Sequence, residues 1–215
     1  MNRILKMLWI DLKTSRLLFL LPVGVMLGFY GMTLFIMKPL SGQMKAWRFG
    51  YLGQEFLIVL FLFWSIMLLQ RWFGQEEAES LRGTAQHHSC LSSLLLVLGL
   101  EFFAFLPGIA VGFLFHVNYL WEVTRIMIYQ VMINALVYIL ACLLKNVFFP
   151  LLLAVSYCLI CDVFGGNNSR LLLIHPGVGE AADYQTVLSL WPYLLAAAVL
   201  LFLADKLDRR MLLIS

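Results

Sequence analysis

The sequence predicts an all-α membrane protein with six transmembrane helices, and three observations lead to that prediction. Hydrophobic residues make up 62% of the 215 residues and charged residues only 13%, whereas soluble domains carry about a quarter charged residues. Several apolar runs reach the roughly 20 residues that a helix needs to cross a bilayer core. The Lys and Arg residues flank these runs and form no long basic tract, so a nucleic-acid partner is not expected.

Residues 1–16 predict an amphipathic helix at the membrane interface. Arg3, Lys6 and Lys13 fall on one helical face, and apolar side chains that include Trp9 fill much of the rest. The first predicted span, 17–37, carries no charge.

The remaining predicted spans are separated by short polar segments and turn formers. Residues 38–55 are expected to form a polar connection with turns at Pro39 and Gly42. Lys145 and Asn146 are expected to make a very tight turn. The further predicted spans are 54–71, with a possible start near Gly50, then 91–115, 124–144, 147–164 and 187–204.

Residues 165–186 form a longer outer segment, and residues 206–215 a cytoplasmic tail. The apolar patch Leu171–Ile174 would not stay in a fully solvated loop, so the outer segment is expected to be partly re-entrant. Residues 1–215 are therefore interpreted as a single transmembrane domain, with the six-span bundle at 17–205.

Six spans place both ends of the chain on one side of the membrane. If that side is the cytoplasm, the cytoplasmic segments hold ten Lys and Arg residues and the outer segments five, which together make the 15 of the chain. Because Lys and Arg accumulate in cytoplasmic loops, the imbalance predicts a multi-pass cell-membrane protein with cytoplasmic termini. The ten are Arg3, Lys6, Lys13, Arg16, Arg71, Arg82, Lys145, Lys206, Arg209 and Arg210, and the five are Lys38, Lys45, Arg48, Arg125 and Arg170.

Glu101, Gln130 and Asn134 are the candidate pathway residues. Glu101 lies near the middle of a predicted span, where a charge is costly unless it faces a cavity or a partner or takes up a proton. It either lines a substrate path or couples to protons, or it hydrogen-bonds to a neighbouring helix. Gln130 and Asn134 lie four residues apart on one helix face, where hydrogen bonds between helices are the simpler interpretation. Pro107 and Gly108 are expected to loosen the helix that carries Glu101.

The cysteines and histidines do not predict a metal site. Cys158 and Cys161 share one face of an apolar helix and are interpreted as small buried residues. His87, His88 and Cys90 lie too close together in the chain to surround one metal ion. The chain also lacks a phosphate-binding glycine loop with Lys and Ser or Thr, so it is not expected to bind ATP or to act as an enzyme by itself.

The segment "EEAESLRGT", residues 76–84, stands out as polar between two apolar runs. Residues 75–82 can form one or two helical turns with acidic side chains at the N-terminal end, where the helix dipole favours them. Gly83 can end that helix in the left-handed conformation, and Thr84 can cap the next helix. The residues of interest are Glu76, Glu77, Glu79, Leu81, Arg82, Gly83 and Thr84.

In this segment and in its layout the chain resembles the permease subunits of ATP-binding-cassette transporters of the type-2 exporter class. Those permeases have a basic amphipathic N-terminal helix, six spans with both ends inside, and an outer re-entrant hairpin before the sixth span. Their first cytoplasmic loop reads as acidic residues, Gly-Thr and an apolar run. Here "AQHHSCLSS" after Gly-Thr is instead polar and lacks the proline that family members often carry, which fits one half of an asymmetric permease pair.

The resemblance implies the partners and the function. The segment 76–84 would be a coupling helix that docks into a groove of a cytoplasmic ATPase subunit, with ATP and Mg²⁺ bound on that partner. A second permease, identical or paralogous, would complete the pathway within a prokaryotic cell membrane. The 17 Phe and 10 Met residues suit an amphipathic peptide, lantibiotic, drug or lipid-like cargo, although they also suit ordinary lipid-facing positions.

Two alternatives stand beside the exporter. An intramembrane metalloprotease of the CAAX type carries a pattern similar to Glu76-Glu77, but Arg82 lies one position late. His116 and His175 also fall in predicted outer loops rather than within spans, where that family holds its metal. A substrate-binding membrane subunit of a vitamin importer has a similar size and span number, but needs no acidic Gly-Thr loop.

Overall fold

A computed structural model describes most of the chain, and every element within the described residues is helical. The described residues are 16–36, 41–73, 90–164 and 181–214. The predicted interfacial helix, the 76–84 segment and most of the 165–186 outer segment lie outside them.

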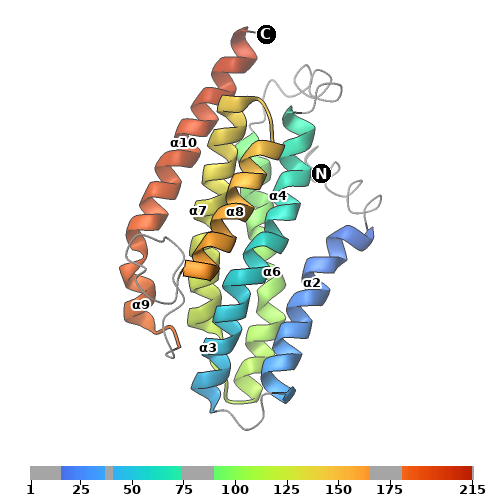
Figure 1. The fold of residues 1–215 in the computed structure, drawn as a ribbon, viewed down its shortest axis with the longest axis vertical. Helices are drawn as coiled ribbons and strands as arrows, with labels where there is room; N and C mark the ends of the chain where they lie inside the picture. The colour runs from blue at the N-terminus through green and yellow to red at the C-terminus, as the bar shows by residue number, and fades with distance from the viewer. Residues whose placement is uncertain (1–15, 37–40, 74–89, 165–180, 215) are drawn as a thin grey trace.

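The helices run up and down an elongated bundle (Figure 1). We call the end at which α10 finishes the upper end, and the end at which α3 begins the lower end. In chain order the elements are α2 (Arg16–Gly31), the π-helical turn η1 (Met32–Ile36), α3 (Gly42–Leu52), the π-helical turn η2 (Gly53–Leu57), α4 (Ile58–Phe73), α6 (Cys90–Leu114), α7 (Leu120–Leu144), α8 (Phe148–Phe164), α9 (Tyr184–Ser189) and α10 (Trp191–Ile214).

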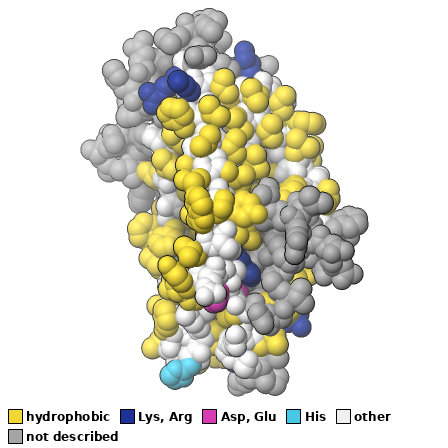
Figure 2. Space-filling model, turned by 90° about the vertical axis from the view of Figure 1, so that its left-hand side faces the viewer, with side chains coloured by type: hydrophobic (Ala, Val, Ile, Leu, Met, Phe, Trp, Pro, Cys, Tyr) yellow, Lys and Arg dark blue, Asp and Glu magenta, His cyan; other side chains and the backbone are white. Residues whose placement is uncertain are grey.

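The length and composition of the helices are consistent with a helical membrane protein. Three helical stretches, Cys90–Leu114, Leu120–Leu144 and Tyr184–Arg209, are long and apolar enough to cross a membrane. Ile58–Gln70 and Phe148–Cys161 are shorter apolar helices. Apolar side chains cover much of the face in Figure 2, and basic side chains lie at its upper end and, less prominently, in its lower half. A membrane helix leaves such side chains exposed to lipid.

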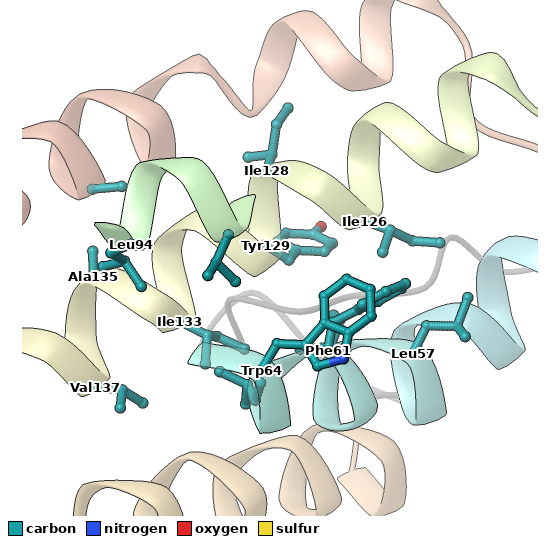
Figure 3. Packing of buried hydrophobic residues seen from close by; sticks show 14 of the residues in the cluster. Leu57, Phe61, Trp64, Leu94, Ile126, Ile128, Tyr129, Ile133, Ala135 and Val137 are labelled. Carbon is teal, nitrogen blue, oxygen red and sulfur yellow. The ribbon is translucent and has the colours of Figure 1, made fainter. Parts of the chain in front are cut away.

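Helix α7 occupies the centre of the bundle. It packs against α3, α4, α6, α8, α9 and α10, and it is the most buried of the three long apolar stretches. Helix α10 packs mainly on α7 and is the least buried of the three. Figure 3 shows the apolar core between α4 and α7, where Leu57, Phe61 and Trp64 face Ile126, Tyr129 and Ile133.

The predicted polar connection at 38–55 is wrong over most of its length. The chain is helical from Gly42, because the Ser41 side chain caps the helix by accepting a hydrogen bond from the Met44 backbone N–H at 3.3 Å. Helix α3 then continues through η2 into α4. Its polar composition hid an apolar stripe, Ala46 and Phe49, which is buried against the bundle.

The turn η2 keeps one face of this long helix directed at α7. Buried positions recur every four residues at Ala46, Gly50, Gln54, Ile58 and Leu62. A strict four-residue spacing drifts around an α-helix of about 3.6 residues per turn. The wider π turn at Gly53–Leu57 corrects that drift, so Gln54 stays on the buried side.

The predicted tight turn between the fourth and fifth spans is confirmed. Lys145 takes the left-handed conformation with φ 51° and ends α7. The Asn146 side chain then accepts a hydrogen bond from the Phe148 backbone N–H at 2.7 Å and starts α8. Helix α10 continues through Ile214, so the predicted tail is helical over residues 206–214.

Candidate functional site

A buried ion pair lies near the lower end of the bundle, at the start of α7. Nη2 of Arg125 donates to Oε2 of Glu122 across 2.5 Å, and both side chains are almost completely buried. They are three residues apart, so they share one face of the helix. Two charges out of water are stable only when they are paired and hydrogen-bonded.

Two residues of the α3–η2 helix complete the surroundings of this pair. With its amide oxygen turned toward the guanidinium, Gln54 accepts hydrogen bonds from Nε of Arg125 at 2.9 Å and from Nη2 at 2.8 Å. Gly50 lies directly against the Glu122 side chain. The Glu122 carboxylate fills the space that a Cβ atom on residue 50 would need. The glycine therefore allows the backbone of α3 to approach the ion pair closely.

The same carboxylate holds the segment that precedes α9. The backbone N–H of Ala182 donates to Oε1 of Glu122 at 2.7 Å, across 60 residues of chain. The next residue, Asp183, caps α9 by accepting from the backbone N–H and the hydroxyl of Thr186, both at 2.7 Å. These hydrogen bonds to Thr186 lower the pKa of Asp183. We call Gln54, Glu122, Arg125 and the Ala182 amide the lower-end cluster.

A second group of polar side chains lies halfway along the bundle. Glu101 is near the middle of α6, on the buried stripe formed with Leu94, Val97 and Phe105, and it is fully buried. Neither of its carboxyl oxygens has a hydrogen-bond partner among the described residues. A buried polar group without a partner is costly in an apolar interior.

Helix α7 presents two amide side chains at this level. Gln130 interacts with the Glu101 carboxyl, but its amide atoms complete no hydrogen bond within the described part of the chain. Asn134, one turn further on, was expected to bond to another helix. Its Nδ2 donates instead to the backbone oxygen of Gln130 at 3.0 Å, and its Oδ1 has no described partner. We call Glu101, Gln130 and Asn134 the mid-bundle cluster.

Aromatic rings of α4 and α6 pack beside the mid-bundle cluster. Phe105 follows Glu101 by one helical turn, and its ring centroid lies 5.3 Å from that of Phe61. Phe61 packs edge-on against Trp64, with centroids 5.2 Å apart. Pro107, which was expected to loosen α6, lies inside the continuous helix. The adjacent Gly108 accommodates the Tyr30 ring, whose hydroxyl donates to the Phe105 backbone oxygen at 3.3 Å.

A third polar contact joins α7 to α10 toward the upper end. The Tyr138 hydroxyl donates to Oδ2 of Asp208 at 3.4 Å, and the Cys142 thiol lies 3.7 Å from the Ala204 backbone oxygen. The prediction that Cys158 and Cys161 are buried is confirmed. Among the described residues, no group of three His, Cys, Asp or Glu side chains could hold a metal ion.

The sequence-based candidates fall into two sets. The coupling residues of the 76–84 segment lie outside the described residues. Of the candidate pathway residues, Glu101 and Gln130 come together between α6 and α7, and Asn134 lies one helical turn from Gln130 on α7. The lower-end cluster was missed, because Glu122 falls between the predicted spans 91–115 and 124–144, and Arg125 was counted with the outer segments. Their i, i+3 spacing beside an apolar run was a signal that could have identified a helical ion pair.

No family model, curated protein or solved structure matches this chain.

Proposed function

We propose that this chain is the permease subunit of an ATP-driven exporter of the type-2 ATP-binding-cassette class. In this proposal it spans a prokaryotic cell membrane six times with both termini in the cytoplasm. It binds no ATP itself. Two cytoplasmic ATPase subunits bind ATP and Mg²⁺, and a second permease, identical or paralogous, completes the pathway.

The acidic Gly-Thr segment 76–84 is the observation that carries the proposal. It connects α4 to α6, and the end of α4 and the start of α6 both lie toward the upper end of the bundle, where α10 finishes (Figure 1). A segment that joins two membrane helices on the side of the C-terminus is available to a partner on that side. A short helix there would transmit nucleotide-driven motion of the ATPase directly into α4 and α6.

The helix contacts support a route for that motion. Helices α4 and α6 pack against each other and against α7, and α7 packs against most of the remaining helices. A displacement of α4 or α6 would therefore reach the mid-bundle cluster, which α6 and α7 form together. The ATPase supplies the chemistry, and this chain supplies the pathway and the mechanical connection.

The test is co-expression of the chain with the ATPase gene next to its own, followed by purification in detergent. We expect the ATPase to copurify and its ATP hydrolysis to rise with cargo. Glu77→Lys and Gly83→Val change the coupling segment and should lower the rate of cargo-stimulated hydrolysis about tenfold, which corresponds to about 1.4 kcal/mol of activation free energy.

Gln86→Ala is the matched control, because it lies in the adjacent stretch where the chain departs from the family pattern. Cargo-stimulated ATP hydrolysis in the complex with Gln86→Ala should equal that with the wild-type chain. If no ATPase copurifies, or if both coupling variants keep full stimulation, the proposed function is wrong.

A further inference from the structure

The mid-bundle cluster offers hydrogen-bonding capacity that the described protein does not use. The unpartnered atoms are both carboxyl oxygens of Glu101, the amide oxygen and nitrogen of Gln130, and the amide oxygen of Asn134. All three residues are at least 99% buried. Oxygens that can accept hydrogen bonds therefore outnumber donors, and one of the groups is a carboxyl group.

This inventory indicates what would complete the cluster. An anion would be repelled by a carboxylate and would find one donor, the Gln130 amide. A group with positive charge and several N–H donors would satisfy all three side chains. A primary ammonium has three such donors and no acceptor, so its donors match the acceptor groups that Glu101, Gln130 and Asn134 offer.

The aromatic rings nearby favour the same ligand. Phe61, Trp64 and Phe105 form a contiguous aromatic group, and its member on α6, Phe105, lies one helical turn from Glu101. The faces of aromatic rings attract cations, and this attraction grows when water is excluded. The rings also provide apolar surface for a hydrocarbon chain attached to the cation.

We propose that Glu101, Gln130 and Asn134 bind the primary ammonium group of an amphipathic amine, with its apolar part against the aromatic rings of α4 and α6. The inference rests on the proposed function, because it identifies the class of cargo that the exporter moves. Glu101 supplies the opposite charge, which makes a cation acceptable in the membrane interior. The two amides orient it.

The experiment measures binding to the full chain alone, in nanodiscs of phosphatidylcholine, whose head group has no N–H donor. The midpoint of thermal unfolding, Tm, is followed while the concentration of a probe increases. The probe is decylammonium. Decyltrimethylammonium has the charge and the chain without N–H donors, and decanol has the chain without the charge. A ligand that binds the folded state raises Tm with its concentration.

For the wild type we expect decylammonium to raise Tm more than either comparison compound does. Glu101→Gln should weaken its apparent affinity about tenfold to a hundredfold, because a charge-assisted hydrogen bond is lost. Gln130→Leu keeps the carboxyl group and should also weaken binding. Asp205→Asn is the matched control, since Asp205 pairs with Arg209 in α10 at 2.8 Å, and it should bind as the wild type does.

Equal shifts from the three compounds, or an unchanged decylammonium shift in Glu101→Gln, would overturn the site. If Asp205→Asn weakened the affinity for decylammonium as much as Glu101→Gln does, the site would also be overturned. The effect would then follow from the loss of any acidic side chain and not from the loss of Glu101. None of these results depends on an ATPase. If the site fails while cargo-stimulated hydrolysis still requires Gly83, the proposed function stands without this cargo class.

Discussion

The lower-end cluster and the mid-bundle cluster both bury polar groups against α7, but they differ in how those groups are paired. In the lower-end cluster, Glu122, Arg125 and Gln54 bond to one another, and Glu122 also holds a backbone amide. In the mid-bundle cluster, the side chains of Glu101 and Gln130 interact with each other, but their carboxyl and amide atoms complete no hydrogen bond within the described part of the chain. The first arrangement stabilises the fold, whereas the second leaves capacity for a ligand.

This difference predicts opposite responses to substitution. Removing one member of a satisfied buried network leaves its partners without compensation and is strongly destabilising. Removing a buried group that has no partner takes away an unfavourable group. Functional sites often lower stability in this way.

Glu122→Gln should cause the largest loss. The Arg125 guanidinium would remain buried without its counter-charge, and a loss of about 3–5 kcal/mol in the free energy of unfolding is expected. Reversible unfolding in mixed micelles, followed by circular dichroism, measures it. Asp205→Asn removes an acid from an ion pair whose Arg209 side chain is largely exposed, and it should change stability by less than about 1 kcal/mol.

Gly50→Ala should be the next most harmful. The added methyl group would overlap the Glu122 carboxylate and push α3 away from α7. We expect the free energy of unfolding to fall by about 1–3 kcal/mol. Gly24→Ala is the matched control in α2, where nothing lies within 4 Å of the added carbon. In the control, the free energy of unfolding should rise by about 0.5–1 kcal/mol, because alanine has the higher helix propensity. Equal effects at the two glycines would contradict the close approach of α3 to α7 at Gly50.

Tyr138→Phe should have a smaller effect. It removes a long hydrogen bond of 3.4 Å to Asp208 and leaves the ring in place. The free energy of unfolding should therefore fall by about 0.5–1 kcal/mol. The same unfolding measurement applies. A loss as large as that of Glu122→Gln would show that the contact between α7 and α10 contributes as much as the lower-end cluster.

The smallest effect concerns the cap of α9. Because the pKa of Asp183 is lower in the folded state than in the unfolded chain, its contribution to stability is present at neutral pH. It is lost as pH falls through the lowered folded-state pKa. Asp183→Asn keeps a capping side chain that does not titrate. The difference in free energy of unfolding between the wild type and Asp183→Asn should shrink as pH falls. If this difference stayed constant, the Asp183 cap would not be its source.

The positions of the helices could be predicted from the sequence more completely than the polar contacts. Charge-free apolar runs and the Lys145–Asn146 turn are local signals, and α6, α7 and α8 begin and end close to the expected residues. The helix that contains α4 begins earlier than expected, and α10 ends later. Helix α3 was missed because its charged residues outweighed its buried stripe. The π turn that directs Gln54 toward α7 has no signal in the residue pattern, since it results from packing between helices.

The candidate site was predictable to a similar degree. Glu101 was recognisable because an acidic residue near the middle of an apolar run needs an explanation. The expected hydrogen bond between helices at Asn134 was wrong, since its amide bonds within its own helix instead. A local bond of this kind competes with tertiary partners in ways that spacing alone does not decide.

The most direct measurement is the free energy of unfolding of Glu101→Leu compared with that of Glu122→Leu under identical conditions. The two changes remove the same kind of side chain from equally buried positions in neighbouring helices. We predict a loss of about 3–5 kcal/mol for Glu122→Leu and no loss, or a gain, for Glu101→Leu. A loss at Glu101 as large as that at Glu122 would contradict the account, because it would show that the mid-bundle carboxyl group is already paired within the protein.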